Sequence, residues 1–289
     1  MAVIPVGRLA PKGQWDQNTL ERLLTNQLYP TGLEFKWHEG FPNTDGCILI
    51  IPGRYWAEHT DRINLAISHA KYRWLLVIRS SDEEDWLDVK KIDHQNLKCW
   101  VQYPRKQNDY GDARCFGVGF PAHFNRLPTN PPDKNLDAFL SAQNTHTRRN
   151  LAFAHLAETK TRVVRETPGF TQGMKPAEYV DHMLRAKVAP APSGIQSPDS
   201  FRLYEALESH AVPIADDVSP VYESHGYWDR LFPDAPFPVL EDYEDLSVFI
   251  DALIADWPRC ANRVVAWWMR EKRRLAHALR EDLEKLGAL

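Results

Sequence analysis

One stretch of the chain combines residue types that can bind phosphate, and it reads P-S-G-I-Q-S-P-D-S-F-R-L-Y-E-A-L-E-S from Pro192 to Ser209. A strand-like apolar run ends near Ala191, a loop with glycine and serine follows, and Ser197 and Pro198 are residue types that begin helices. A loop that leads into a helix presents backbone N–H groups and the positive end of the helix dipole. The pattern therefore predicts a diphosphate site at the start of this helix.

Two charged side chains, Arg202 and Glu205, lie three positions apart on the same predicted helix and share a face. In one interpretation, Glu205 accepts hydrogen bonds from ribose hydroxyls, while Arg202 or nearby backbone N–H groups neutralise the diphosphate. Those N–H groups belong to Asp199, Ser200 and Phe201. In the other interpretation, the two side chains form a surface ion pair that contributes roughly a few tenths of a kcal/mol. Spacing alone leaves both open.

The motif resembles the donor-binding motif of GT-B glycosyltransferases, specifically of the exostosin-like group. In that group a P-x-G loop leads into D-S-x-R-x-x-E-A-L and then G-x-x-P-V, and this chain has similar letters from Pro192 to Ile214. The resemblance covers most of residues 138–275, and residues 74–125 loosely. Four further segments resemble parts of the same group, namely residues 143–149, 169–173, 80–84 and 267–272.

The resemblance implies a nucleotide-sugar donor, in particular a UDP-sugar, held by the second half of the chain. Arg148 and Arg149 are the side chains expected to neutralise its diphosphate, because the planar guanidinium donates two hydrogen bonds to a phosphate. We expect at least one of the two to be an ordinary helix-surface arginine instead. The expected donor-binding residues are Arg148, Arg149, Thr171, Ser193, Gly194, Asp199, Ser200, Phe201, Arg202 and Glu205.

One position departs from the pattern of the group. His210 stands where the group has glycine, between the motif's helix and the strand that follows it. This helix-end position favours a left-handed backbone, which histidine adopts more readily than most residues. We therefore expect an adapted helix end and an unchanged fold.

The resemblance also implies inversion at the anomeric carbon of the sugar, which requires a general base for the acceptor hydroxyl. Asp82 and Glu83 follow a predicted strand of the first half and are the expected catalytic residues. The alternative is that the run from Asp82 to Asp85 is a solvated loop, and Asp109 and Asp112 are then the reserve candidates. The sequence has no D-x-D triplet, which favours transfer without a metal. No cofactor is expected besides the nucleotide sugar as co-substrate.

The sequence identifies the residues that bind the acceptor less clearly than those that bind the donor. Arg54, Tyr55 and Trp56 follow a strand-like run and are the expected acceptor-binding residues, the rings by stacking and the arginine by charge. Residues 117–121 form a second candidate loop, and packing explains both loops equally well. The acceptor that we favour is the hydroxymethylated base of a modified DNA, of the 5-hydroxymethylcytosine type, which would have to be flipped out of the duplex. A glycan acceptor is one alternative, and a non-catalytic nucleotide-binding module is the other.

Apolar runs that alternate with helical patterns must position these residues, and they are typical of α/β folds with parallel strands. The predicted strands span residues 3–6, 33–37, 47–51, 74–78, 99–103, 138–142, 161–164, 188–191 and 211–215. The predicted helices span residues 15–28, 61–70, 147–158, 176–185 and 200–209.

The expected architecture is therefore α/β, with the two Rossmann-like domains of a GT-B fold facing a central cleft. Residues 1–125 form the expected acceptor domain, residues 126–137 a proline-rich linker, and residues 138–289 the donor domain. An amphipathic closing helix is expected over residues 256–286, where apolar residues recur at helical spacing and arginines lie between them.

The composition limits the possible function classes. The chain has 289 residues, 43% of them hydrophobic and 26% charged, with a net charge of −4, which is typical of a globular protein. This charge argues against a protein that coats nucleic acid, although it permits a local DNA-binding groove. The four dispersed cysteines do not predict a zinc site or a disulfide framework. No leader or membrane-spanning run is recognised, so we expect a cytoplasmic location, in the host if the protein is viral.

Overall fold

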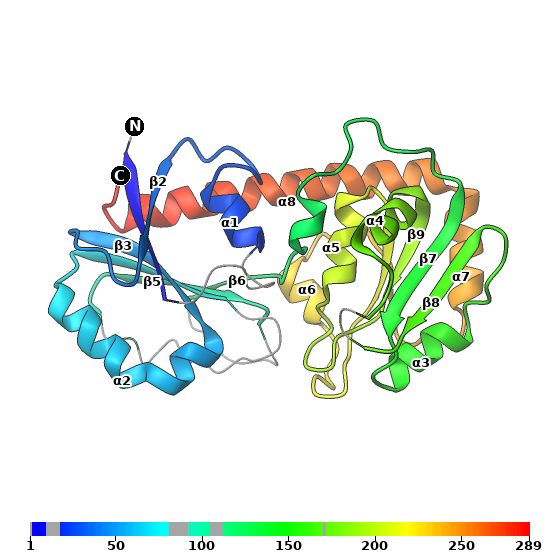
Figure 1. Cartoon of the computed structure of the whole chain (residues 1–289), viewed down its shortest axis with the longest axis horizontal. Helices are drawn as coiled ribbons and strands as arrows, with labels where there is room; N and C mark the ends of the chain where they lie inside the picture. Colours follow the sequence, from blue (N-terminus) through cyan, green and yellow to red (C-terminus); the bar gives the residue numbers. More distant parts are fainter. Residues whose placement is uncertain (1, 10–17, 81–91, 93, 105–111, 170–171) are drawn as a thin grey trace. The chain divides into compact units, whose positions relative to one another are not determined.

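The computed structural model describes residues 2–9, 18–80, 92, 94–104, 112–169 and 172–289. They form two compact units, the first made of residues 1–118 and 270–289, and the second of residues 119–269. Each unit is built on its own β-sheet with helices packed against it (Figure 1). All strand pairs are parallel, as the alternating sequence pattern predicts.

The sheet of the first unit has six strands in the order β2-β1-β3-β4-β5-β6. The five strands that the sequence predicts for this half are all present, and β6 adds a short edge strand. The strands are β1 (Val3–Arg8), β2 (Glu34–Glu39), β3 (Gly46–Pro52), β4 (Trp74–Ser80), β5 (Leu97–Gln102) and β6 (Arg114–Phe116).

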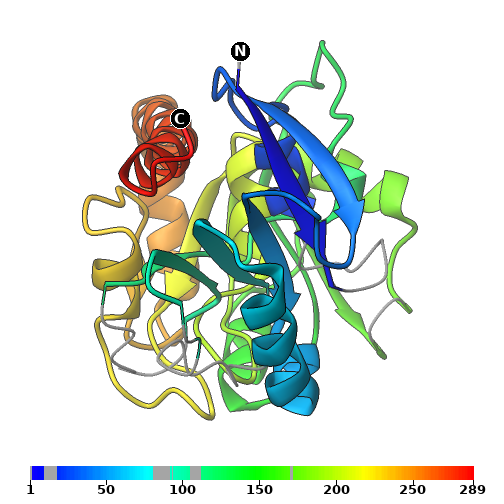
Figure 2. The same ribbon diagram turned by 90° about the vertical axis from the view of Figure 1, so that its left-hand side faces the viewer.

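Helices cover both faces of this sheet. The helix α2 (Gly53–Ala70) lies on one face, and α1 (Asn18–Leu24) and the end of α8 (Trp257–Lys285) lie on the other (Figures 1 and 2). Every residue of β3 and β4 is buried, which explains why these strands are mostly apolar, although β4 ends in the buried Arg79 and Ser80. The sequence predicts this helix only over residues 61–70, whereas α2 begins at Gly53. Non-helical backbone at His59 interrupts the helix.

Asp282 fastens the end of α8 to the first sheet. Its Oδ2 accepts hydrogen bonds from Trp100 Nε1 at 2.8 Å and from Arg114 Nε at 3.1 Å, and its Oδ1 accepts one from Arg114 Nη2 at 3.2 Å. Asn96 Nδ2 also donates to the carbonyl oxygen of Leu286 at 2.9 Å. The final part of α8 is therefore an integral part of the first unit.

The sheet of the second unit has five strands in the order β11-β10-β9-β7-β8. The chain passes from β7 to β8 on one side and then continues with β9 on the other side of β7. Ligands of open parallel sheets bind beyond the carboxyl ends of the strands at such a reversal of strand order. The strands are β7 (Leu136–Gln143), β8 (Arg162–Thr167), β9 (Ala186–Ala191), β10 (Val212–Asp216) and β11 (Val239–Leu240).

Helices α4 and α5 pack on one face of the second sheet, and α3 and α7 pack on the other (Figure 1). The sequence predicts α3, α4 and α5 but neither α6 nor α7. The α7 sequence, LSVFIDALIA, is apolar almost all round and therefore lacks the alternation that reveals a surface helix. The elements are η3 (Ala122–Phe124), α3 (Thr147–Ala154), α4 (Pro176–Arg185), α5 (Phe201–Glu208), α6 (Tyr227–Leu231) and α7 (Leu246–Ala255).

The structure agrees with the sequence prediction at the end of α5 but differs from it at the start. His210 has a φ of 57°, the left-handed conformation expected at this position. The predicted helix over residues 200–209 is confirmed to within one residue at each end, but Ser197 and Pro198 do not begin it, because α5 starts at Phe201 with Ser200 as its N-cap. The Ser197 hydroxyl instead accepts a hydrogen bond from the Asp199 N–H at 3.2 Å, which closes a separate turn before the helix.

The last helix also differs from its expected place. The sequence assigns it entirely to the second domain, whereas residues from Arg270 onward belong to the first unit. Its amphipathic pattern runs on through both parts, so the periodicity does not reveal which unit each stretch packs against. Within the described residues, no helix is both long and apolar enough to cross a membrane.

We predict that Asp282→Ala lowers the free energy of unfolding by about 2–3 kcal/mol, because it leaves Trp100 and Arg114 without their shared acceptor. Urea denaturation followed by tryptophan fluorescence measures this change. Glu281→Ala, at the exposed neighbouring position, is the control and should have little effect. Equal stabilities for the two variants would contradict the anchoring role of Asp282.

Candidate functional site

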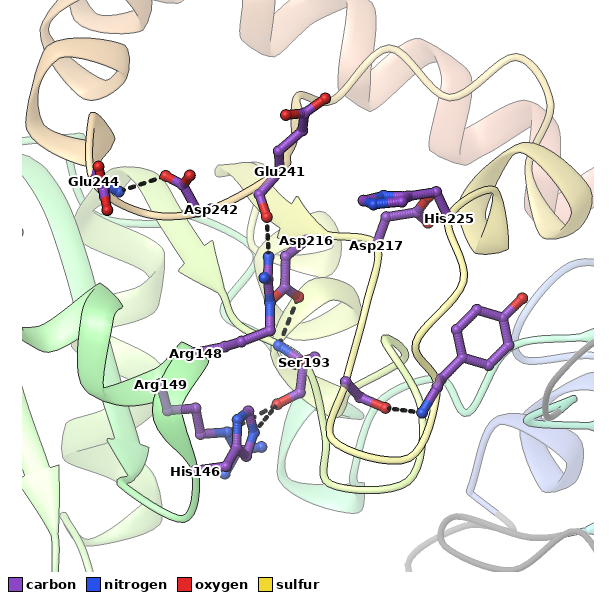
Figure 3. A network of polar contacts seen from close by, with 12 residues as sticks. His146, Arg148, Arg149, Ser193, Asp216, Asp217, His225, Glu241, Asp242 and Glu244 are labelled. Carbon is purple, nitrogen blue, oxygen red and sulfur yellow. Dashed lines mark hydrogen bonds and ion pairs between the residues drawn. The ribbon is translucent and has the colours of Figure 1, made fainter.

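The candidate site lies at the carboxyl edge of the second sheet, where the strand order reverses. The loops that follow β7 and β9 leave the sheet beside each other, because these two strands are paired. Figure 3 shows that His146 from the first loop, Arg149 from the start of α3 and Ser193 from the second loop point toward one another. Asp216, at the end of β10, completes the group.

Asp216 is completely buried and joins several of these segments. Its Oδ1 accepts a hydrogen bond from the Ser193 backbone N–H at 2.8 Å, and its Oδ2 accepts one from Arg148 Nε at 2.5 Å. Arg148 Nη2 also donates to the Glu241 carbonyl oxygen at 2.6 Å (Figure 3). Burial raises the pKa of Asp216 to about 6, although Arg148 acts in the opposite direction.

Arg149 and His146 both hold the carbonyl oxygen of Ser193. Arg149 Nε donates to it at 2.9 Å, and Arg149 Nη1 donates to the Gln143 carbonyl oxygen at 3.0 Å. His146 Nε2 lies 3.0 Å from the same Ser193 oxygen. Burial, reinforced by the charge of Arg149, lowers the pKa of His146 to about 4, so its ring is neutral. Because a carbonyl only accepts, this neutral ring carries its proton on Nε2.

The expectation that Arg148 or Arg149 is an ordinary surface arginine is wrong. Arg149 is buried, and the Arg148 side chain is only 18% exposed. Both guanidinium groups organise the loops of the candidate site through internal hydrogen bonds. The sequence indicates their location after β7, but it does not reveal their partners, because Ser193 and Asp216 are distant in the chain.

Several buried polar atoms at this edge have no hydrogen-bond partner among the described residues. Buried polar groups are nearly always hydrogen-bonded, so a ligand with polar atoms would satisfy such a set. The hydroxyls among them can donate to phosphate oxygens. The atoms are Thr145 Oγ1, His146 Nδ1, Ser193 Oγ, Ser200 Oγ and Tyr243 Oη.

The segment between β9 and α5 is also largely buried. The Asp199 N–H is bound to Ser197 Oγ and is therefore not the phosphate donor that the sequence suggests. The Asp199 carboxylate accepts a hydrogen bond from the Tyr227 hydroxyl at 3.3 Å. Ser200 and Phe201 begin α5, Gly194 is half-buried, and no side chain caps the helix start.

Glu205 is buried on α5, so the alternative of a surface ion pair with Arg202 is wrong. Its Oε2 accepts a hydrogen bond from the Tyr179 hydroxyl at 2.5 Å, and its Oε1 lies 3.7 Å from His123 Nε2. Arg202 Nε donates to the Ser141 carbonyl oxygen at 2.8 Å. Burial raises the pKa of Glu205, and the charge of Arg202 and the bond from Tyr179 oppose this rise.

A pocket of about 180 Å³ opens beside the ends of β10 and β11. Asp217 shapes its wall, since its carboxylate accepts hydrogen bonds from the backbone N–H groups of Gly226 and of Trp228, the latter at 3.2 Å. Figure 3 shows Asp217 and His225 near each other at this pocket. The lining residues are Asp217, His225, Trp228, Asp229, Val239, Leu240 and Glu241.

The acceptor-binding residues expected in the first unit differ in how far they are buried. Trp56 is 1% exposed and packs in the core of the unit, so it cannot stack on an acceptor in this conformation. Tyr55 is partly buried against the same core, with its ring edge-on to His59 at 4.5 Å. Arg54 lies in the first turn of α2, and its side chain is outside the described part of the structure.

The expected catalytic residues Asp82 and Glu83 lie outside the described residues, as do Thr171 and the reserve candidate Asp109. The second reserve candidate, Asp112, is exposed, and Lys98 Nζ donates to it at 3.0 Å. This bond lowers the pKa of the Asp112 carboxyl group. In the part of the chain that the structure describes, no cluster of three or more His, Cys, Asp or Glu residues is arranged to hold a metal ion.

Tyr179, His123 and Asp216 are site residues that the sequence motifs do not identify in these roles. Tyr179 and His123 reach Glu205 from α4 and η3, far from it in sequence. A signal that can be read from the sequence exists only for Asp216, which directly follows the predicted strand over residues 211–215 and is therefore expected at the ligand-binding edge of the sheet.

The chain resembles two solved structures over nearly its whole length. One, described as the DNA-modifying enzyme β-glucosyltransferase with and without its substrate uridine diphosphoglucose, is 14% identical, with a TM-score of 0.51 and coverage of 98% of this chain and 99% of the other. Anabaena HepE in complex with UDP is 9% identical, with a TM-score of 0.57 and coverage of 98% and 100%. No protein-family model matches the chain. No curated protein matches its sequence significantly.

These similarities confirm the fold class that the sequence predicts, an α/β chain of the GT-B type with two Rossmann-like units. At such low identity, they establish the fold alone. The resemblance to the exostosin-like group therefore stays a prediction.

We predict that Asp216 makes the stability of the protein depend on pH. Between about pH 4 and pH 6 the unfolded chain has lost this proton while the folded chain keeps it, so the contribution of Asp216 falls as pH rises through this window. Relative to Asp216→Asn, wild type should lose about 3 kcal/mol of unfolding free energy between these limits. Urea denaturation at several pH values measures the difference, and a difference that is independent of pH would contradict the buried, protonatable carboxyl group.

Proposed function

We propose that the protein is a nucleotide-sugar-dependent glycosyltransferase that uses a UDP-sugar and transfers the sugar to a hydroxyl group of an acceptor. The observation that carries this proposal is the set of hydroxyls at the carboxyl edge of the second sheet and the start of α5 that have no partner among the described residues, together with the buried Glu205 on α5. The GT-B fold supports it, because one structural neighbour is described with uridine diphosphoglucose and the other with UDP.

In this proposal the diphosphate binds at the loop between β9 and α5. Ser193 and Ser200 supply hydroxyl donors, and the start of α5 supplies the positive end of a helix dipole. Arg148 stabilises the departing diphosphate from the start of α3. Arg149 acts through the loop, because its guanidinium group holds the Ser193 carbonyl oxygen. Glu205 accepts a hydrogen bond from the ribose.

The proposed transfer inverts the anomeric centre. The acceptor oxygen attacks the anomeric carbon, the bond from that carbon to the diphosphate oxygen breaks, and UDP leaves with the bonding electrons. The proton of the acceptor hydroxyl passes to a carboxylate of the first unit, for which Asp82 and Glu83 are the candidates from the sequence. No step requires a metal or a further cofactor.

The acceptor that we propose is a hydroxymethylated base in DNA. The likeness to a structure described as a DNA-modifying enzyme supports this choice, and so does the primary hydroxyl that such a base offers. A glycan is the second candidate, favoured by the resemblance of residues 192–214 to the exostosin-like group. Both acceptors would use the same donor site.

The decisive experiment incubates the protein with UDP-sugars and either DNA containing 5-hydroxymethylcytosine or unmodified DNA, and analyses the nucleosides by mass spectrometry. We expect the mass of one sugar residue to be added to the modified base only. Transfer of the sugar to members of an oligosaccharide panel but not to DNA would show that the acceptor is a glycan. Tight UDP binding without transfer to any acceptor would instead favour a binding module.

We predict that Glu205→Ala weakens UDP binding by about 10- to 100-fold, because hydrogen bonds to a charged group contribute roughly 1.5–3 kcal/mol. Isothermal titration calorimetry measures the dissociation constant. The control is Glu178→Ala, which removes an exposed carboxylate from the neighbouring helix α4 and should leave the affinity unchanged. Unchanged affinity in Glu205→Ala would remove Glu205 from the donor site.

A further inference from the structure

A basic surface on the final helix, α8, has no role in the proposed transfer. Every exposed charged residue between Pro258 and Arg280 is an arginine, although the whole chain carries a net charge of −4. The exposed arginines are Arg259, Arg263, Arg270, Arg273, Arg274 and Arg280. Positive charge that gathers on one helix of an acidic protein indicates a polyanionic partner.

Four of these arginines lie in the part of α8 that belongs to the first unit. The helical period of 3.6 residues places them and His277 on one side of the helix. The opposite side is buried and includes Leu279 and Leu283. We call the exposed side the arginine face, and it consists of Arg270, Arg273, Arg274, His277 and Arg280.

The guanidinium groups of the arginine face are open to competition by an anion. Arg270 and Arg273 form no ion pair among the described residues. The other two arginines pair with glutamates one helical turn away, at 2.7 and 2.9 Å. Exposed ion pairs of this kind are weak, whereas a phosphate accepts two hydrogen bonds from one guanidinium group. A phosphate can therefore replace the glutamates.

A neighbouring turn orients part of the arginine face. The guanidinium carbon of Arg273 lies 5.6 Å from the centre of the Tyr29 ring, and the His277 ring lies 6.4 Å from the same ring. Arg280 reaches Gly32, since a β-carbon at Gly32 would lie 3.5 Å from Arg280 Nη1. Residues 25–33 include no acidic residue. The turn thus restricts the arginines without neutralising their charge.

The dimensions of the arginine face fit the backbone of a nucleic acid. An α-helix rises by 1.5 Å per residue, so Arg270 and Arg280 are about 15 Å apart along the helix axis. One strand of duplex DNA advances by about 3.4 Å per nucleotide, so this length corresponds to about four phosphates. A row of guanidinium groups over such a length can contact several phosphates of one strand at once.

An anionic membrane fits this face less well. Helices that lie on a membrane insert an apolar side between the lipids. The apolar side of α8 is instead buried within the protein, as at Leu279 and Leu283. Among the described residues of α8, only Met269 exposes a large apolar side chain. The charge of the arginine face is therefore not combined with a surface that could enter a bilayer.

We propose that the arginine face binds the phosphate backbone of the duplex DNA whose base receives the sugar. This inference rests on the proposed function, because it takes the DNA acceptor from there and adds a surface that holds the duplex. Contacts to phosphates do not depend on the base sequence. Unmodified duplex DNA therefore binds to the same surface and can serve as the probe.

Neutralising two arginines tests this surface. We expect Arg270→Gln/Arg273→Gln to weaken the binding of a fluorescein-labelled, unmodified duplex by about tenfold at about 100 mM NaCl, measured by fluorescence anisotropy. The slope of log K against log[NaCl] should become smaller in magnitude by about 2, because two phosphate contacts are lost. Partial unfolding would lower the affinity at every salt concentration but leave this slope unchanged. Unchanged affinity and slope, or no binding of DNA by wild type, would overturn the proposal.

The matched control is Arg62→Gln/Lys71→Gln. It removes the same net charge from exposed positions on and after α2, which lies on the opposite face of the first sheet from the end of α8 (Figures 1 and 2). We expect this variant to keep the affinity and the slope of wild type. Equal losses in the two double variants would show that only the total charge matters and would refute a specific arginine face.

Vesicles of phosphatidylserine and phosphatidylcholine test the other anionic partner. Loss of vesicle binding but not of DNA binding in Arg270→Gln/Arg273→Gln would show that the face binds membranes, and the proposal would be wrong. The assay also separates this proposal from the proposed function. Arginine-dependent DNA binding without sugar transfer would support the surface and contradict the DNA acceptor. Transfer to hydroxymethylated DNA with unchanged affinity in the double variant would contradict the surface alone.

Discussion

The candidate site depends on the charge of one buried side chain, Asp216. A carboxylate without solvent must be compensated by hydrogen bonds or by an opposite charge. Asp216 obtains both, from the Ser193 backbone N–H and from the Arg148 guanidinium group. These two partners come from the loop after β9 and from the start of α3, and Arg148 extends the network to Glu241 after β11. The requirement to compensate one charge thus brings four segments of the second unit to one edge of its sheet.

A second buried carboxylate, Glu205, has the opposite character. Both oxygens of Asp216 have strong partners, whereas Glu205 has a partner at hydrogen-bond distance on only one oxygen among the described residues. A carboxylate with both oxygens occupied is suited to hold loops in place. One with an open oxygen is suited to accept from a ligand. The carboxylates on β10 and α5 therefore differ in the number of donors around them, and in our proposal the one on α5 binds the ligand.

Arginine shows the same division between structure and chemistry. Arg149 donates hydrogen bonds to backbone carbonyl oxygens at the end of β7 and just after β9, and these bonds hold the two backbone segments in place. In the first unit, Arg114 and Trp100 share the Asp282 carboxylate and secure the end of α8. In both units, hydrogen bonds of polar side chains connect segments that are far apart in the sequence, and these directional bonds fix the relative positions of the segments more specifically than hydrophobic packing does.

The sequence by itself determined the α/β class, the parallel strands and the left-handed end of α5 at His210, because these follow from local periodicity and from local backbone preference. It also located, after β9, the motif that we propose to bind phosphate. It did not determine that Trp56 is a core residue, that Ser197 closes a turn before α5, or that Tyr179 bonds to Glu205. Only the tertiary structure decided these points. Burial and hydrogen-bond partners depend on residues that are far apart in the chain, and neither spacing nor residue type encodes which distant donor reaches a given carboxylate.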